Sequence, residues 1–310
     1  MKSEEFKFKG YEETDIYYYR WPIAKEKQAR AIVMILHGMA EHGARYERFA
    51  NFLNEKNYIV YAIDHRGHGK TGLAMERMGY FGKGGWDQLV EDAHQLLTII
   101  KSEHQDLPII VLGHSMGSVL AKTFISEYGS EIDGIILSGT TNGVNFFARK
   151  FGLFFAKTIS FLTGPKNESP ILQFVFFNNY NKRFKQAKLL YAWLSRDEKE
   201  VQKYLEDDLC GYACTSSFYV DLMKGINKNA KKENIKKVPK DLPMFIFSGT
   251  MDPVGSFSKD VIKTYDLYKD VANLDNVEIK LYEDGRHEML NEVNRQEVFE
   301  DVASWLDKFF

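Results

Sequence analysis

The sequence has few of the features that would stiffen a chain covalently or hold it in a membrane. Its 310 residues include two cysteines, Cys210 and Cys214, which are too few for a disulfide framework or a cysteine-based metal site. No stretch approaches the roughly 18 consecutive apolar residues that a membrane-spanning helix requires. The N-terminus, from Met1 to Lys9, alternates in charge and lacks the apolar segment of a signal peptide. These absences predict a cytoplasmic protein.

The sequence also lacks a large charge excess of either sign. Its formal net charge is −2, which gives no argument for binding nucleic acid. Hydrophobic residues make up 44% and charged residues 27%, as in ordinary globular proteins. The length fits one large domain, or one domain that carries a sizeable insertion.

One stretch in the middle of the chain carries the strongest chemical pattern. Four apolar residues, Ile109 to Leu112, predict a short buried strand, and Gly113-His-Ser115-Met-Gly117 follows at once. Apolar residues then recur at helical spacing: Val119, Leu120, Phe124 and Ile125. A G-x-S-x-G pattern between a buried strand and a helix is typical of a nucleophile elbow, a strained turn that presents a serine hydroxyl above a sheet. Both glycines are expected because a Cβ there would collide with neighbouring backbone. Ser115 is therefore the predicted nucleophile.

Buried strands and amphipathic helices alternate through most of the chain, which predicts an α/β fold with a doubly wound, mostly parallel sheet. The segments 5–8 and 15–19 predict an antiparallel hairpin at one edge of the sheet. The further predicted strands are 31–36, 58–63, 109–112, 135–137, 244–247 and 277–282. Helices are predicted over 86–104 and, at the end of the chain, over 293–310.

The alternation stops between about Thr140 and Pro239. We therefore expect a core of residues 1–140 and 241–310 and a helical insertion over 141–240. Ten of the 23 phenylalanines fall between Phe146 and Phe184. Residues 146–240 hold 18 lysines and arginines against 9 acidic residues, a net charge of +9, which leaves −11 on the rest of the chain. The near-neutral net charge of the chain is therefore the sum of a basic insertion and an acidic remainder.

The insertion suggests two kinds of contact. Four of its phenylalanines share one helical face: Phe147, Phe151, Phe154 and Phe155. Three basic residues lie on the other: Arg149, Lys150 and Lys157. We expect the phenylalanines to contact an apolar substrate, with packing onto the core as the alternative. The positive charge predicts a weak peripheral contact with anionic membrane, with a solvated face as the alternative.

A serine nucleophile on such a sheet needs a histidine and an acid, which follow it in the order acid, histidine. His287 is the only one of the eight histidines that follows Ser115, and it lies in the loop after the last predicted strand. The neighbouring Glu288 suggests a zinc motif, but position 291 is Asn, so H-E-x-x-H fails and no metal is expected. His287 is therefore the predicted base.

The acid is expected just after the predicted strand 244–247. Asp252 has that position, in Ser248-Gly-Thr-Met-Asp252-Pro. An aspartate before a proline is also a common turn, and Glu283, Asp284 and Asp260 are the alternative acids. We favour Asp252.

The oxyanion of an acyl intermediate needs two backbone N–H donors. One belongs to the residue after the nucleophile, Met116, and the other to the loop after the strand 31–36. That loop reads His37-Gly-Met39-Ala-Glu-His-Gly43, and we assign the second donor to Met39.

Four separated motifs give the chain a resemblance to the monoglyceride lipase/lysophospholipase branch of the serine α/β-hydrolases. They are His37-Gly-Met-Ala-Glu-His42, Asp64-His-Arg-Gly-His-Gly69, Gly113-His-Ser-Met-Gly117 and Gly285-Arg-His-Glu-Met-Leu-Asn-Glu292. The resemblance covers the core from about residue 30 to the C-terminus. It implies an α/β-hydrolase fold in which the insertion is a cap, or lid, over an acyl pocket, and a lipid-like carboxylic ester as the small-molecule substrate.

The residues support acyl transfer through Ser115, His287 and Asp252, a mechanism that requires no cofactor and no metal. Two alternatives stay open. The same triad serves short-chain carboxylesterases and serine peptidases or amidases, which a broad polar cleft under the cap would favour. A hydrolase fold can also act as a non-catalytic small-molecule receptor, which the intact set of catalytic residues disfavours. The sequence gives no indication of an oligomeric state.

Overall fold

A computed structural model describes residues 2–142, 146–184 and 189–310. Eight strands form one sheet in the order β1-β2-β4-β3-β5-β6-β7-β8. The strands are β1 (Glu4–Lys9), β2 (Asp15–Trp21), β3 (Ala31–Leu36), β4 (Tyr58–Ile63), β5 (Ile109–His114), β6 (Gly134–Ser138), β7 (Met244–Gly249) and β8 (Val277–Tyr282). β1 and β2 pair antiparallel, as does β2 with β4, and all other pairs are parallel. The predicted α/β-hydrolase fold and the edge hairpin are confirmed.

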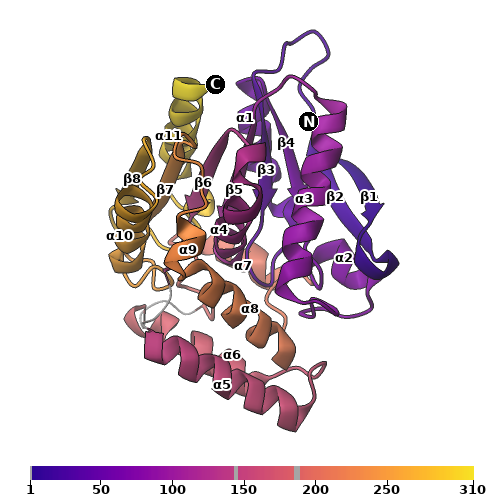
Figure 1. Ribbon diagram of the computed structural model, residues 1–310, viewed down its shortest axis with the longest axis vertical. Coiled ribbons are helices and arrows are strands. Elements are labelled where there is room, and N and C mark those ends of the chain that lie inside the picture. Colours follow the sequence, from indigo (N-terminus) through magenta and orange to yellow (C-terminus); the bar gives the residue numbers. More distant parts are fainter. Residues whose placement is uncertain (1, 143–145, 185–188) are drawn as a thin grey trace.

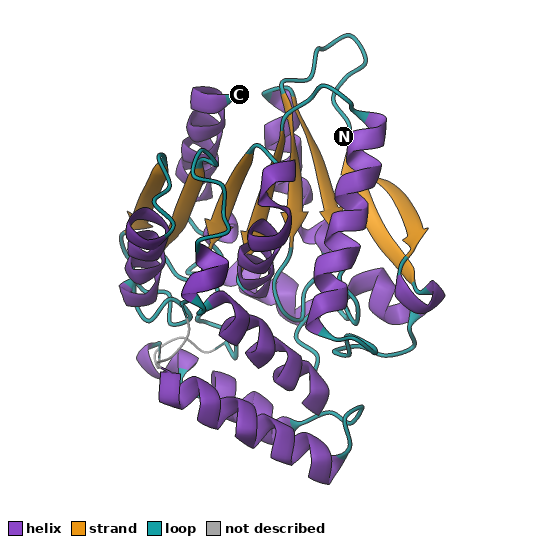
Figure 2. Cartoon of the chain, in the orientation of Figure 1, coloured by secondary structure: helices purple, strands orange, loops and turns teal. Residues whose placement is uncertain are grey.

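Helices cover both faces of the sheet (Figure 2). α1 (Glu47–Glu55) and α11 (Arg295–Phe309) bury their apolar faces in one hydrophobic cluster with one side of the strands. α3 (Trp86–Glu103), α4 (Met116–Tyr128) and α10 (Lys259–Asp266) pack in the cluster on the other side. β3, β4 and β5 are buried along their whole length, because helices cover both of their faces. This explains why their sequences are continuous apolar runs.

Shorter elements complete the core. α2 (Gly69–Ala74) follows β4, and α10 runs into a single π-helical turn over Leu267–Val271. The 3₁₀ turns of the core are Tyr11–Glu13, Gly43–Tyr46, Gly129–Glu131 and Met289–Asn291.

The predicted insertion is helical in the part of it that the structure describes. Its helices are α5 (Phe146–Thr163), α6 (Pro170–Phe177), α7 (Glu198–Glu206), α8 (Ser216–Asn229) and α9 (Lys232–Ile235), with a 3₁₀ turn over Tyr180–Arg183. α5 and α6 form the layer farthest from the sheet, and α8 lies between this layer and the core helices (Figure 1). Phe218, Tyr219 and Leu222 of α8 are buried in the same cluster as α3 and α4. The last part of the insertion thus joins the main hydrophobic core.

Among the described residues, no helix combines the length and the apolar character needed to cross a membrane.

Candidate active site

Ser115 occupies a strained turn between β5 and α4. Its backbone has φ 53° and ψ −117°, a region that non-glycine residues rarely adopt. The flanking glycines permit this turn: a Cβ on Gly113 would lie 2.4 Å from the Gly117 carbonyl oxygen, and a Cβ on Gly117 would lie 1.9 Å from the Leu36 oxygen. The Ser115 N–H donates to the Ser138 carbonyl at 3.0 Å, which ties the turn to β6. The local conformation that G-x-S-x-G predicts is present.

His287 and Asp252 are brought together from the loops that follow β8 and β7. The imidazole Nδ1 lies 3.0 Å from both carboxylate oxygens of Asp252, and both side chains are buried. Asp252 also accepts hydrogen bonds from the Ser248 hydroxyl at 2.8 Å and the Val254 N–H at 2.9 Å. Two other acids considered from the sequence, Glu283 and Asp284, are exposed. A buried carboxylate on Nδ1 leaves Nε2 as the nitrogen that can face a substrate.

This pairing shifts the pKa of both groups. Burial alone would lower the pKa of His287, but the charge of Asp252 and their hydrogen bond raise it above its ordinary value of 6.5. Burial alone would raise the pKa of Asp252, but His287, Ser248 and Val254 lower it below 3.8. Each group therefore stabilises the charged form of the other.

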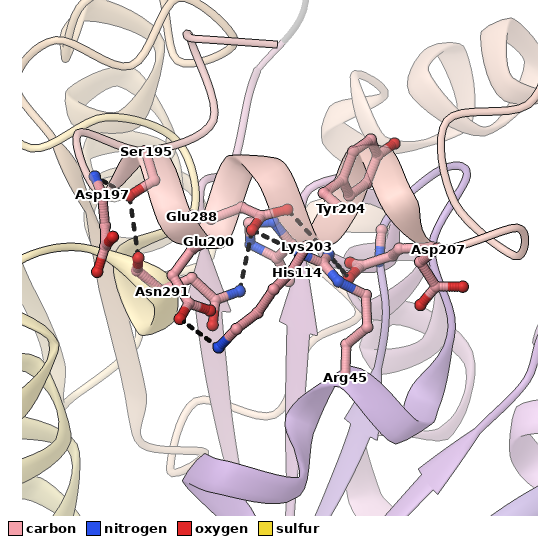
Figure 3. A network of polar contacts seen from close by, with 12 residues as sticks. Arg45, His114, Ser195, Asp197, Glu200, Lys203, Tyr204, Asp207, Glu288 and Asn291 are labelled. Carbon is pink, nitrogen blue, oxygen red and sulfur yellow. Dashed lines mark hydrogen bonds and ion pairs between the residues drawn. The ribbon is translucent and has the colours of Figure 1, made fainter. Parts of the chain in front are cut away.

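The loop after β3 is held by Glu41. The Gly38 N–H donates to its Oε1 at 2.6 Å, and the Tyr46 hydroxyl donates to the same oxygen at 3.0 Å. Arg45 binds the second oxygen of Glu41 at 2.5 Å and the two oxygens of Glu288 at 2.9 and 2.8 Å. The loop that carries Met39 is therefore fixed by a buried ionic network, part of which appears in Figure 3.

The motif Asp64-His-Arg-Gly-His-Gly69 is a structural turn beneath this loop. The Asp64 carboxylate accepts the N–H groups of Gly43 and Lys70 at 2.8 and 2.7 Å and the Tyr19 hydroxyl at 3.1 Å. The ring of His65 lies 4.2 Å from that of His37, centroid to centroid. Burial lowers the pKa of His65 to about 3 and that of His68 to about 4, so both rings are neutral near pH 7.

A pocket of about 980 Å³, open mouth included, is lined by Ser115 and His287. From the core, its lining includes Met39, Ser115, Met116 and His287. From the insertion, its lining is mainly aromatic, with Phe176, Phe177, Tyr180, Tyr191, Trp193 and Tyr212. The site thus joins a serine, a buried His–Asp pair and an apolar cavity.

The family described as "Serine aminopeptidase, S33" matches residues 27–294. The chain belongs to this family. The match covers the core motifs and the whole insertion, and it agrees with the resemblance expected from the sequence.

Relatives that are named as lipases or esterases match nearly the full chain. The chain is 26% identical over 307 residues to the monoacylglycerol lipase of Mycolicibacterium smegmatis, covering 97% of this chain and 96% of that protein. It is 28% identical over 281 residues to the monoglyceride lipase homolog of monkeypox virus, covering 89% of each. A solved carboxyl esterase from Bacillus coagulans, in complex with glycerol, superposes with a TM-score of 0.91 at 26% identity, covering 100% of this chain and 99% of that one. This S33 family member is therefore a serine ester hydrolase related to the monoglyceride lipases.

The four phenylalanines predicted to bind substrate are placed elsewhere. Phe147, Phe151 and Phe154 are exposed, at 81%, 69% and 68% of their surface. Phe155 is partly buried and packs against the core cluster. None of the four lines the pocket that contains Ser115. The sequence pattern identified residues that share a helix face, but it did not show that three of the four are exposed.

The pocket residues that sequence reasoning missed come from irregular or short segments of the insertion. Trp193 lies in the loop before α7, and its ring centroid is 5.1 Å from that of His287. Phe176 and Phe177 end the short helix α6. The only signal for them was the aromatic richness of 146–184, which does not distinguish inner from outer positions.

Proposed function

We propose that this chain hydrolyses monoacylglycerols, that is, esters of one long acyl chain with a small neutral alcohol. The observation that carries the proposal is the character of the pocket around Ser115 and His287: its walls are mainly aromatic and aliphatic, and no lysine or arginine lines it among the described residues. Such a cavity buries an acyl chain favourably, at about 0.8 kcal/mol per methylene. The relationship to monoglyceride lipases supports the same substrate class.

In the proposed mechanism His287 takes the proton of Ser115 as its Oγ attacks the ester carbonyl. The backbone N–H groups of Met39 and Met116 stabilise the oxyanion. His287 then gives the proton to the leaving glycerol oxygen, and an acyl-enzyme remains on Ser115. Asp252 keeps the imidazole in the tautomer that presents Nε2 and stabilises the imidazolium. Water repeats the sequence and releases the fatty acid.

The charges of the pocket favour a neutral head group. Its acidic lining residues are Glu41 and Glu288, and both are already bound by Arg45. A phosphodiester head group would enter a buried site that offers it no cation, and desolvating an unpaired charge is costly. We therefore favour monoacylglycerols over lysophospholipids. Because both acidic residues are paired with Arg45, the described lining of the pocket offers no free carboxylate to the α-amino group of a peptide, which disfavours aminopeptidase activity.

The test compares kcat/KM across p-nitrophenyl esters from acetate to palmitate, and across oleoyl esters with two head groups. We expect kcat/KM to rise by up to about fourfold per methylene until the pocket is filled. Oleoylglycerol should exceed oleoyl-lysophosphatidylglycerol by at least about tenfold, since an unpaired buried charge costs several kcal/mol. A preference for acetate would support a short-chain carboxylesterase instead, and release of p-nitroaniline from aminoacyl anilides would support a peptidase.

We also propose that the outer layer of the insertion touches lipid surfaces. Phe151, Phe154 and Phe161 of α5 are exposed, and so are Ile171 and Phe174 of α6. Exposed apolar patches of this kind mark interaction sites. The nearby Lys150 and Lys157 are also exposed and would add attraction to anionic lipid, at most about 1 kcal/mol for each charge.

Co-sedimentation with vesicles tests this contact. Binding should be stronger to vesicles that contain phosphatidylserine than to phosphatidylcholine vesicles, and should weaken at about 0.5 M salt, where screening is short-ranged. Phe151→Ser with Phe154→Ser should reduce binding to both, and Arg149→Glu with Lys150→Glu and Lys157→Glu should remove the anionic preference. The matched control is Leu73→Ser, because Leu73 is an exposed leucine that lies outside the insertion. Equal binding by the phenylalanine variant and the wild type would contradict the proposal.

A further inference from the structure

Three side chains with different donor atoms meet where the insertion touches the loop after β3. His42 comes from that loop, and Asp207 and Cys210 come from the segment after α7. His42 Nε2 lies 2.9 Å from an Asp207 oxygen, and the nitrogen, oxygen and sulfur atoms all lie within 4.8 Å of one another. His42 and Cys210 are 8% and 9% exposed, and Asp207 is partly exposed.

Two of these three side chains have binding capacity that the described protein contacts do not use. The Nδ1 atom of His42 is buried without a hydrogen-bond partner in the described part of the chain. Cys210 is a free, buried thiol. The proposed acyl-transfer mechanism uses none of the three residues. A buried imidazole, a buried thiol and a partly exposed carboxylate are therefore gathered in one place without a role in that reaction.

The surrounding charges favour a cation. The guanidinium of Arg45 is close to this cluster, but Glu41 and Glu288 bind it on both sides. Asp207 is a third carboxylate in this region, and Figure 3 shows it with Arg45 and Glu288. His114, which also faces this network, is neutral near pH 7 because burial lowers its pKa to about 4. A divalent ion would compensate the excess negative charge.

We propose that His42, Asp207 and Cys210 bind a zinc ion. Imidazole, thiolate and carboxylate are the ligands that Zn²⁺ accepts together, and three protein ligands leave a fourth position for water. Zinc–ligand bonds of about 2.0 to 2.3 Å place tetrahedral ligands about 3.3 to 3.7 Å apart. The nitrogen–oxygen separation of 2.9 Å and the upper limit of 4.8 Å for the other pairs differ from these values by about 1 Å. Binding releases the thiol proton of Cys210, since the thiolate is the ligand form.

The ion would connect the insertion to the loop that carries Met39. Two hydrogen bonds already join these parts: the Ala40 carbonyl accepts the Gly211 N–H at 3.0 Å and the Tyr204 hydroxyl at 2.9 Å. Gly211 and Tyr204 also line the catalytic pocket. Zinc therefore fastens the pocket wall to the predicted oxyanion loop, and this contact is independent of which ester the enzyme cleaves.

This site was not visible in the sequence, where two cysteines were expected to bind no metal. His42 and Asp207 are 165 positions apart, so no local spacing pattern marks them. Only the docking of the segment after α7 onto the loop after β3 brings them together.

Titration with Co²⁺, followed by displacement with Zn²⁺, tests the proposal in the full-length protein. We expect saturable binding of one Co²⁺ per chain with a thiolate-to-cobalt absorption band that Zn²⁺ abolishes. Cys210→Ser and His42→Gln should each weaken binding at least about 100-fold, because even changes outside the ligand shell cost 10- to 100-fold. Cys214→Ser is the matched control, because it removes the other buried cysteine and should retain the band. His287→Ala should retain it too, which separates this site from the catalytic histidine.

Thermal unfolding gives a second readout that does not depend on activity. Saturating Zn²⁺ should raise the Tm of the wild type by at least about 2 °C, since a ligand bound only by the folded chain stabilises it. The Tm of Cys210→Ser should not respond. A wild type without a cobalt band, or a Cys210→Ser variant that binds as tightly as the wild type, would overturn the proposal. So would binding that is lost in His287→Ala and kept in Cys210→Ser.

Discussion

Trp193, from the insertion, lies against His287, from the core. Their ring centroids are 5.1 Å apart at an interplanar angle of 42°, and the Trp193 carbonyl accepts the His287 N–H at 3.3 Å. Next to them, the Leu194 carbonyl accepts the Glu288 N–H at 2.7 Å. Arg286 donates to the carbonyls of Ala192 and Ser195 at 2.6 and 2.9 Å. The insertion therefore does more than cover the pocket, because it holds the loop that carries the predicted base.

Trp193 should accordingly act as a positioning residue. We expect Trp193→Ala to lower kcat by up to about 100-fold, since small misplacements of a catalytic group cost that much. Trp193→Phe should retain most of the wild-type kcat because it keeps a ring against His287. The measurement is kcat and KM separately on a soluble p-nitrophenyl ester, with circular dichroism as the folding control. A change in KM alone would mean that Trp193 only lines the pocket.

The pH profile should report the raised pKa of His287. The base must be neutral, so kcat/KM should rise with pH through an acidic limb whose midpoint lies above 6.5, the ordinary histidine value. Asp252→Asn removes the charge that raises this pKa, so the midpoint should move to lower pH. The profile is measured on an uncharged ester. A rate that is flat from pH 5 to 8 would argue against a histidine base.

Three of the four acids considered from the sequence, Asp252, Glu283 and Asp284, can be distinguished by isosteric changes. Asp252→Asn should lower kcat by about 10⁴-fold, because the imidazole loses the partner that fixes its tautomer. Glu283→Gln and Asp284→Asn are matched controls from exposed positions and should stay close to the wild type. Near-normal activity of Asp252→Asn would show that the acid has been assigned wrongly.

Arg45 should be important for stability because it lies, largely buried, between two carboxylates. Arg45→Met leaves Glu41 and Glu288 facing each other without a cation, and removing one partner of a buried ion pair costs about 3 to 5 kcal/mol. The exposed pair Arg30–Asp307 is the matched control, and Arg30→Met should cost at most about 1 kcal/mol. Urea unfolding measures both. Equal costs for the two substitutions would contradict the view that the Arg45 network holds the loop after β3.

Buried neutral histidines should make the fold sensitive to acid. Burial lowers the pKa of His65 to about 3 and those of His68 and His114 to about 4, whereas unfolded histidine titrates near 6.5. Between these values the unfolded chain binds more protons, so the free energy of unfolding should fall as the pH drops from about 6.5 to 4, by up to about 1.4 kcal/mol per histidine and pH unit. The Tm is measured across this window. His68→Gln should flatten the slope, and an unchanged slope would contradict this assignment.

The sequence predicts the core better than the insertion, for a physical reason. In a parallel sheet the loops after successive strands meet at one edge, so the order of Ser115, Asp252 and His287 along the strands suffices to bring them together. The insertion has no such rule. Helical periodicity groups Phe147, Phe151 and Phe154 on one face. It does not tell whether other parts of the chain cover that face.

Contacts between distant segments were also beyond prediction from local patterns. Arg45 and Glu288 are 243 positions apart, and their pairing follows from the approach of the loops after β3 and β8. Trp193 lies in a segment without regular structure, where no periodicity indicates a direction. The contacts that depend on how the insertion packs against the core could therefore be identified only from the structure.

Ser115 is proposed to be a nucleophile that His287 activates. Intact-protein mass spectrometry after treatment with a fluorophosphonate ester tests it most directly. We predict one covalent adduct per chain, located on Ser115 by peptide mapping, absent in Ser115→Ala and formed far more slowly in His287→Ala. An adduct that persists in Ser115→Ala, or a wild type that is not labelled while it hydrolyses esters, would contradict the account.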